Sequence, residues 1–72
     1  MIEGMVQGLA DRLQDNPDDL EGWLMLMRSY SVLGKPEKAS ASAGQALAAF
    51  EGSPSRQDAI RSAMAELGIK VD

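Results

Sequence analysis

Carboxylate side chains are concentrated between residues 15 and 21, where they could hold a metal ion or exchange protons. Asp15, Asp18, Asp19 and Glu21 lie in this segment. Their spacing lacks the alternating ligands and the central glycine of a calcium-binding loop. Asp18 or Asp19 stands instead just before an apolar run, where a carboxylate caps the N-terminus of a helix. The segment therefore predicts a capped helix with solvated acids, and no metal site.

The chain has neither histidine nor cysteine. This removes the usual general base and the imidazole and thiolate ligands of zinc sites. Its serines have no histidine partner that would make one of them a nucleophile. Gly34-Lys35-Pro36 lacks the earlier glycine and the following Ser/Thr of a phosphate-binding loop. We therefore expect no enzyme and no cofactor.

The composition is that of a small folded domain. The chain has 72 residues, of which 44% are apolar and 25% charged, and its net charge is −4. These values are typical of one globular domain with a thin core. The negative charge argues against nucleic acid or an anionic membrane as partner, and no run of about 18 apolar residues predicts a membrane span. We expect one domain over 1–72 that is a fragment of a longer protein and makes no membrane contact itself.

The elements that must position any site are helices, because apolar residues recur at intervals of three and four and no strand pattern occurs. The all-α prediction comprises a helix over 2–14, a helical hairpin over 18–50 and a C-terminal helix over 54–68. In the hairpin, large side chains face alanines, which permits close packing. The predicted core positions are Ile2, Met5, Val6, Leu9 and Leu13; Trp23, Leu26, Met27, Tyr30 and Leu33; Ala39, Ala43, Ala46, Leu47 and Phe50; and Ala59, Ile60, Ala63, Met64 and Leu67.

Glycine, proline and serine mark the ends of these helices. Gly34 is expected in the left-handed conformation after the first hairpin helix, and Pro36 at the first position of the next one. A link this short predicts an antiparallel pair. Ser53 is expected to cap the last helix, which ends at Gly68. Ile69 is expected to pack back on the last turn.

A shift of 34 residues aligns the two halves of the chain. It places Leu33-Gly34 on Leu67-Gly68 and Leu26 on Ile60. Few identities are kept, but the apolar register and the helix ends are. The chain therefore comprises a half-repeat, a full repeat and a second half-repeat. A plain helical hairpin with flanking helices is the alternative.

The full repeat carries Trp23-x-x-Leu26-Met27-x-x-Tyr30 followed by Ala39-x-x-x-Ala43. This motif resembles the tetratricopeptide repeat (TPR) and its 34-residue period. Pro17 stands where the TPR pattern closes the preceding repeat. Three positions depart from that pattern: Met27 replaces a small residue, Ala43 replaces an aromatic one, and the proline expected near position 51 comes three residues late.

A narrower resemblance covers most of the chain. The combination of Gly4-Met5-Val6-Gln7-Gly8-Leu9 with Gly22-Trp23-Leu24 and Arg28-Ser29-Tyr30 is similar to the TPR region of the CycH/CcmI family of c-type cytochrome biogenesis proteins. The resemblance implies a chaperone-like domain of a membrane-anchored assembly protein, on the periplasmic face of the bacterial inner membrane. It also implies that this region holds unfolded apocytochrome c for the haem-ligation machinery. The membrane anchor would lie outside these residues.

A candidate peptide-binding face lies on the first hairpin helix, nearly opposite its core stripe. The face consists of Glu21, Leu24, Arg28, Ser31 and Val32. Leu24 and Val32 are apolar, and Arg28 offers a forked donor set suited to a carboxylate. The face is therefore expected to form a shallow groove for an amphipathic helix or extended peptide. In the alternative, neighbouring helices cover the two apolar residues and Arg28 pairs with Glu21 or Asp19.

The predicted function is non-catalytic binding of a peptide or protein, with apocytochrome c as the partner that the resemblance implies. Two alternatives remain. A generic TPR scaffold would dock a different protein partner. A self-associating structural module would pair the uncovered apolar stripes of its half-repeats between chains.

Overall fold

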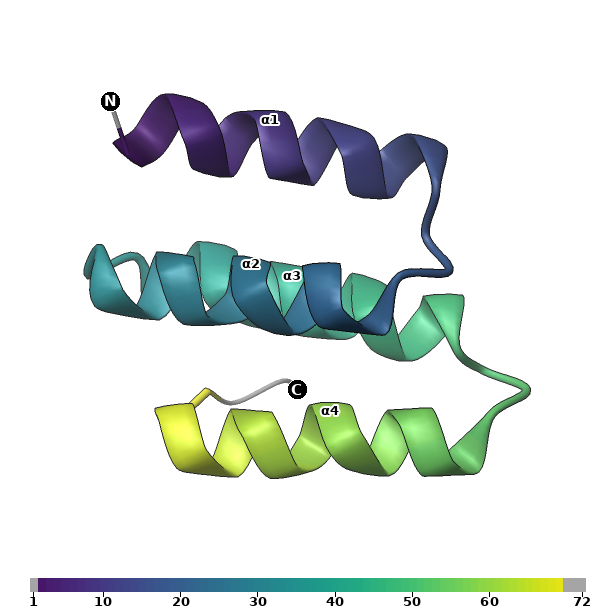
Figure 1. Cartoon of the computed structure of the whole chain (residues 1–72). Helices are drawn as coiled ribbons and strands as arrows, with labels where there is room; N and C mark the ends of the chain where they lie inside the picture. The colour runs from purple at the N-terminus through teal and green to yellow at the C-terminus, as the bar shows by residue number, and fades with distance from the viewer. Residues whose placement is uncertain (1, 70–72) are drawn as a thin grey trace.

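The computed structural model describes residues 2–69, with side chains from residue 4 onward. Within this range the chain forms four helices and no strand, which confirms the all-α prediction. The helices are α1 (Ile2–Asp15), α2 (Leu20–Val32), α3 (Pro36–Ala49) and α4 (Pro54–Leu67). Figure 1 shows α2 between α1 and α4, with α3 behind it. The side chain of Ile2 and residues 70–72 lie outside the described part of the chain.

The start of α2 is fixed by a side-chain cap and by a close approach to α1. Asp19 is the N-cap, and its Oδ1 accepts a hydrogen bond of 3.1 Å from the backbone N–H of Gly22. A Cβ atom at Gly22 would stand 2.7 Å from Asp19 Oδ2 and 2.9 Å from Leu13 Cδ2. Because Gly22 has no Cβ, the Asp19 cap and the buried side chain of Leu13 can both approach the backbone of α2 at this point.

The α2–α3 hairpin turns within three residues. Gly34 has φ of +74°, the left-handed conformation that glycine adopts without steric cost. The N–H of Lys35 donates to the carbonyl of Tyr30 at 2.9 Å, and the N–H of Gly34 to that of Ser31 at 3.2 Å. This pair of bonds is a Schellman motif. Pro36 then opens α3 at its first turn, as predicted.

The end of α4 has a similar glycine cap. Gly68 has φ of +72°, and the N–H of Ile69 donates to the carbonyl of Met64 at 2.8 Å. Ile69 is buried against the core, which confirms that it packs back. The structural period is also visible in the helix starts, because α3 begins 34 residues after α1 and α4 begins 34 residues after α2. The arrangement is consistent with a TPR-like hairpin and its flanking half-repeats.

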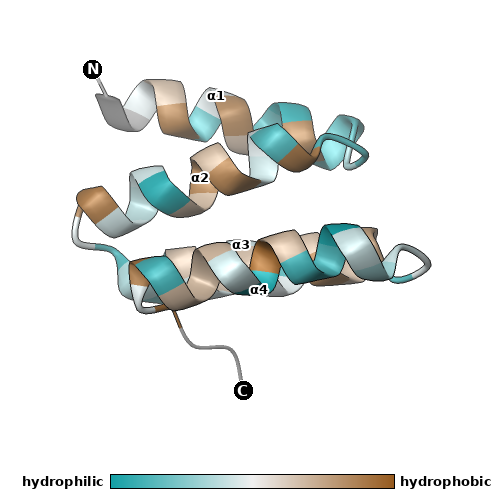
Figure 2. Ribbon diagram, turned by 60° about the horizontal axis from the view of Figure 1, so that its bottom comes forward, coloured by the Kyte–Doolittle hydropathy of each residue, from teal (hydrophilic) through white to brown (hydrophobic). Residues whose placement is uncertain are grey.

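The core lies where α2 and α3 face each other, and α1 and α4 close it on either side. Brown and teal segments alternate along the helices in Figure 2, as expected for helices with one apolar face. Among the predicted positions, Met27, Ala39, Ala43, Ala46 and Ile60 are fully buried. The buried apolar residues are Val6, Leu13, Trp23, Leu26, Met27, Ala39, Ala43, Ala46, Phe50, Ile60 and Ile69.

Two details differ from the sequence predictions, and one buried residue was not predicted. Met5 was expected in the core but is 75% exposed, because Val6 occupies the side of α1 that faces α2. Ser53 stands at the N-cap of α4, yet its side chain makes no capping hydrogen bond. Ser42 is buried among the alanines of α3, where its small size fits the close helix contact.

Candidate peptide-binding groove

A shallow groove runs between α2 and α4. Its volume is about 350 Å³, at the lower end of the range of ligand-binding pockets. Leu24, Met25, Ala63 and Leu67 give it apolar walls. The lining residues are Glu21, Leu24, Met25 and Arg28 from α2, and Ala63, Glu66 and Leu67 from α4.

The structure brings together three of the five residues predicted for this face. Glu21, Leu24 and Arg28 line the groove. Ser31 and Val32 belong to the last turn of α2 and are not among the lining residues. Val32 is 80% exposed, so the alternative in which neighbouring helices cover it is wrong. Leu24 is half-buried and packs against the core, so one edge of the groove is fixed by the fold.

Arg28 is the positive charge of this groove, and Glu21 and Glu66 are its acids. The Arg28 side chain is exposed. Among the described side chains, no ion pair joins it to Glu21 or to Asp19, the two partners of the alternative prediction. A guanidinium in this position can donate two parallel hydrogen bonds to an incoming carboxylate.

Helix α4 supplies lining residues that the prediction from α2 alone missed. Ala63, Glu66 and Leu67 form the wall opposite Leu24. The 34-residue period contained a usable signal, since it makes α4 the counterpart of α2 in the next repeat. Equivalent helices of adjacent repeats stack side by side in repeat proteins, so the predicted repeat would have placed α4 beside α2.

A second hollow lies on the other side of α2, against α1. Its volume is about 420 Å³, and Met25 belongs to its lining as well as to that of the first groove. Met25 therefore stands on the ridge between two apolar depressions. The lining residues of this hollow are Met5, Val6, Gly8, Leu9 and Arg12 from α1, and Met25 and Ser29 from α2.

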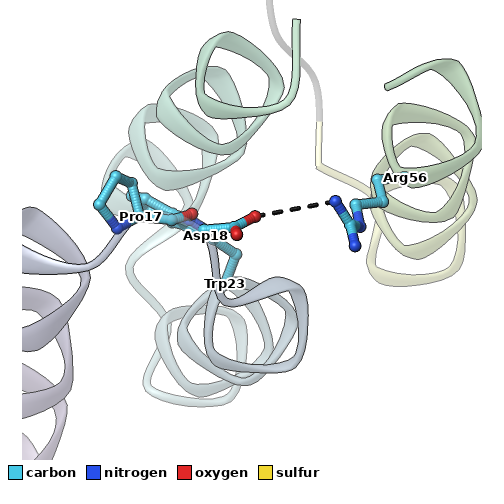
Figure 3. Close-up of polar contacts among 4 residues, drawn as sticks. All are labelled: Pro17, Asp18, Trp23 and Arg56. Carbon is cyan, nitrogen blue, oxygen red and sulfur yellow. Dashed lines mark hydrogen bonds and ion pairs between the residues drawn. The ribbon is translucent and has the colours of Figure 1, made fainter. Parts of the chain in front are cut away.

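Polar contacts at the N-terminal end of α4 join it to the α1–α2 link and to α3. The Arg56 guanidinium lies 3.7 Å from the Asp18 carboxylate (Figure 3) and 5.5 Å from the centre of the Phe50 ring. Gln57 Nε2 also donates to the carbonyl of Leu47 at 3.0 Å. These contacts hold the first turn of α4, whereas the groove residues Ala63, Glu66 and Leu67 lie in its second half.

The segment that carries Asp18 is itself held by Trp23. The indole Nε1–H of Trp23 donates to the carbonyl of Pro17 at 2.8 Å. The ring is 2% exposed, so it is a core side chain and not a stacking platform. A buried indole N–H needs such a partner, and the bond ties the α1–α2 link to the hairpin core.

Neither a metal centre nor a membrane-spanning helix is present in the part of the chain that the structure describes. Within residues 2–69, no group of three or more acidic side chains is placed to hold a metal ion. None of the helices in that range is both long and apolar enough to cross a bilayer. The residues that line the groove offer apolar contact, hydrogen bonding and charge pairing.

Comparison with known proteins gives two relatives of the same name. Over 69 residues the chain is 39% identical to the cytochrome c-type biogenesis protein CycH of Bradyrhizobium diazoefficiens and 41% identical to that of Rhizobium meliloti. The similarity covers 96% of the chain but 19% and 18% of the relatives, so the chain spans about a fifth of their length. No family model and no solved structure matches it. The predicted resemblance to cytochrome c-type biogenesis proteins is confirmed over nearly the whole chain, whereas the assignment of this segment as a TPR stays a prediction.

Proposed function

We propose that this segment is a non-catalytic peptide-binding module that assists cytochrome c maturation by holding a segment of apocytochrome c. Similarity to two cytochrome c-type biogenesis proteins over nearly the whole chain supports a role in cytochrome c maturation. The groove between α2 and α4 supports binding as the activity. It combines apolar walls with three charged side chains.

The observation that carries the proposal is the position of Arg28. It lies in the groove beside Leu24 and close to Leu67 of α4, exposed and without an ion pair among the described side chains. An amphipathic helix would place its apolar side chains on the groove walls. Its C-terminal carboxylate or an acidic side chain would accept hydrogen bonds from Arg28. A shallow groove suits binding that is weak enough for the client to be released to the next component.

The resemblance also supplies the setting that we propose. Binding takes place on the periplasmic face of the bacterial inner membrane, in a parent protein that is membrane-anchored. The haem-ligation components are then the partners that receive the client. The two relatives are about five times as long as this chain, so the anchor and the haem-ligation contacts that we propose would lie outside it.

Self-association is the second candidate, because one observation favours it. Met5 and Met25 are 75% and 59% exposed and line the same hollow between α1 and α2. A second copy of the chain could cover this apolar surface, as a neighbouring repeat does in a longer array. A generic scaffold that docks another protein would use the α2–α4 groove with a different client.

The test is a binding titration with three synthetic peptides. One is the C-terminal segment of a c-type apocytochrome, the second is a scrambled peptide of the same composition, and the third is an unrelated amphipathic helix. We expect saturable binding of the apocytochrome peptide and at least about tenfold weaker binding of the scrambled one, a difference of about 1.4 kcal/mol. Equal affinity for an unrelated amphipathic helix would support the generic scaffold instead. No binding of any of the three peptides would reject the groove as a peptide site.

A further inference from the structure

Methionine is the only sulfur-containing residue type in this chain, because cysteine is absent. The methionine side chains differ sharply in exposure. Met5 is 75% exposed and Met25 is 59% exposed, whereas Met27 is fully buried. Met64 is half-buried and packs against the core, and Met1 lies outside the described residues. Oxidants in solution therefore meet the thioethers of Met5 and Met25 first.

Met25 is the exposed methionine that belongs to the binding surface. It lines the α2–α4 groove next to Leu24 and Arg28, and it also lines the hollow between α1 and α2. The unbranched thioether side chain adapts its shape to varied apolar partners. A change of polarity at this one position therefore alters both depressions. Met5 borders only the hollow that α1 forms with α2.

We propose that Met25 is a peroxide-sensitive modification site whose oxidation weakens peptide binding. The thioether sulfur attacks one oxygen of a peroxide, an S–O bond forms and the O–O bond breaks. Sulfur loses two electrons to become a sulfoxide, and the peroxide is reduced to water or an alcohol after proton transfer to the leaving oxygen. The product is polar and chiral, and methionine sulfoxide reductases reverse the reaction. The effect on binding rests on the proposed function of the α2–α4 groove.

The fold is expected to survive this reaction. The core methionine, Met27, is enclosed by the α2–α3 packing and reacts only when the core opens. Sulfoxide at Met25 and Met5 adds a polar group to side chains that are already in contact with water. The modification therefore changes the surface and leaves the buried contacts intact.

The experiment treats the 72-residue chain with hydrogen peroxide and follows it by peptide-mapping mass spectrometry, circular dichroism and peptide titration. We expect Met5 and Met25 to gain one oxygen before Met27, with the helical signal unchanged. The affinity for the apocytochrome peptide should fall by about three- to tenfold, the range of a single thioether contact. Reduction with methionine sulfoxide reductase should restore it.

Two volume-conserving variants separate the methionines. For Met25→Leu, the affinity after treatment should equal its own affinity before treatment, whereas Met5→Leu should lose affinity on treatment as the parent chain does. Oxidation of Met27 as early as Met25, or equal loss of affinity in Met25→Leu, would overturn the inference. If the untreated chain does not bind the peptide, the proposed function and the binding consequence both fail. The order of oxidation in the map still decides whether Met25 is the reactive site.

Discussion

The Trp23 side chain both fills the core and holds the α1–α2 link in place. Its ring fills the core, and its indole N–H holds the carbonyl of Pro17 at 2.8 Å. Trp23→Ala removes both contributions and should lower the free energy of unfolding by about 3–5 kcal/mol, enough to unfold a small domain. Trp23→Phe keeps much of the apolar volume and should cost less. Urea denaturation followed by circular dichroism measures both variants, and a stable Trp23→Ala chain would contradict the assigned core.

Arg28 tests the groove at the level of one charge. Arg28→Glu reverses the charge on an exposed side chain and should leave the free energy of unfolding nearly unchanged. The affinity for the apocytochrome peptide should fall by about tenfold or more, because a charge-assisted hydrogen bond becomes a repulsion. Peptide titration monitored by fluorescence anisotropy measures this loss.

Arg61→Glu is the matched control for that substitution. Arg61 lies on α4, is exposed, and its Nη1 stands 3.6 Å from Asp58. It is not among the residues that line the α2–α4 groove. The control makes the same change in net charge and should leave peptide affinity close to that of the parent chain. Similar affinity losses for both variants would show that net charge, and not the position of Arg28, governs binding.

At the scale of elements, two helical glycines should respond oppositely to the same substitution. Gly22→Ala places a methyl group against the Asp19 cap and Leu13, so it should lower the free energy of unfolding by about 1–2 kcal/mol, the value of a lost cap. Gly8→Ala meets no atom within 4 Å of its new Cβ and should raise it by up to about 1 kcal/mol through helix propensity. Thermal unfolding measures the change in stability of each variant. A change of the same sign in both variants would contradict the close approach of α1 and α2.

Local signals in the sequence were sufficient to predict the helices and their ends. Asp19, Gly34, Pro36 and Gly68 act within one or two turns, so their roles can be predicted without knowledge of the tertiary structure. The exposure of Met5 could not be predicted in this way, because the apolar periodicity is satisfied whether Met5 or Val6 faces the neighbouring helix. Only the packing of α1 on α2 selects Val6.

The candidate groove was predicted only in part, for a related reason. The face of α2 that carries Leu24 and Arg28 follows from helical geometry. The opposite wall does not follow from the geometry of α2 alone, because Ala63 and Leu67 come from α4. The 34-residue period points to α4 as a neighbour of α2, but the packing of the two helices decides which α4 residues face the groove. Ser31 and Val32 share the angular position of the others but lie beyond the stretch that α4 covers.

At the scale of the whole molecule, the oligomeric state separates a binding module from a structural one. Although Met5, Met25 and Val32 are exposed, we expect the chain to be a monomer whose surfaces are free for a client. Light scattering at two concentrations that differ by about tenfold should give the same mass, since self-association follows mass action. A mass that rises with concentration would support pairing through the uncovered half-repeats.

The central claim is that a client peptide occupies the groove between α2 and α4. Its most direct test is an NMR titration of the isotope-labelled chain with the C-terminal peptide of a c-type apocytochrome. We predict that the resonances of Leu24, Arg28 and Leu67 shift in a saturable way, while those of Ala41 and Gln45, exposed on α3, do not. Unchanged groove resonances, or shifts of equal size with an unrelated amphipathic peptide, would contradict this account.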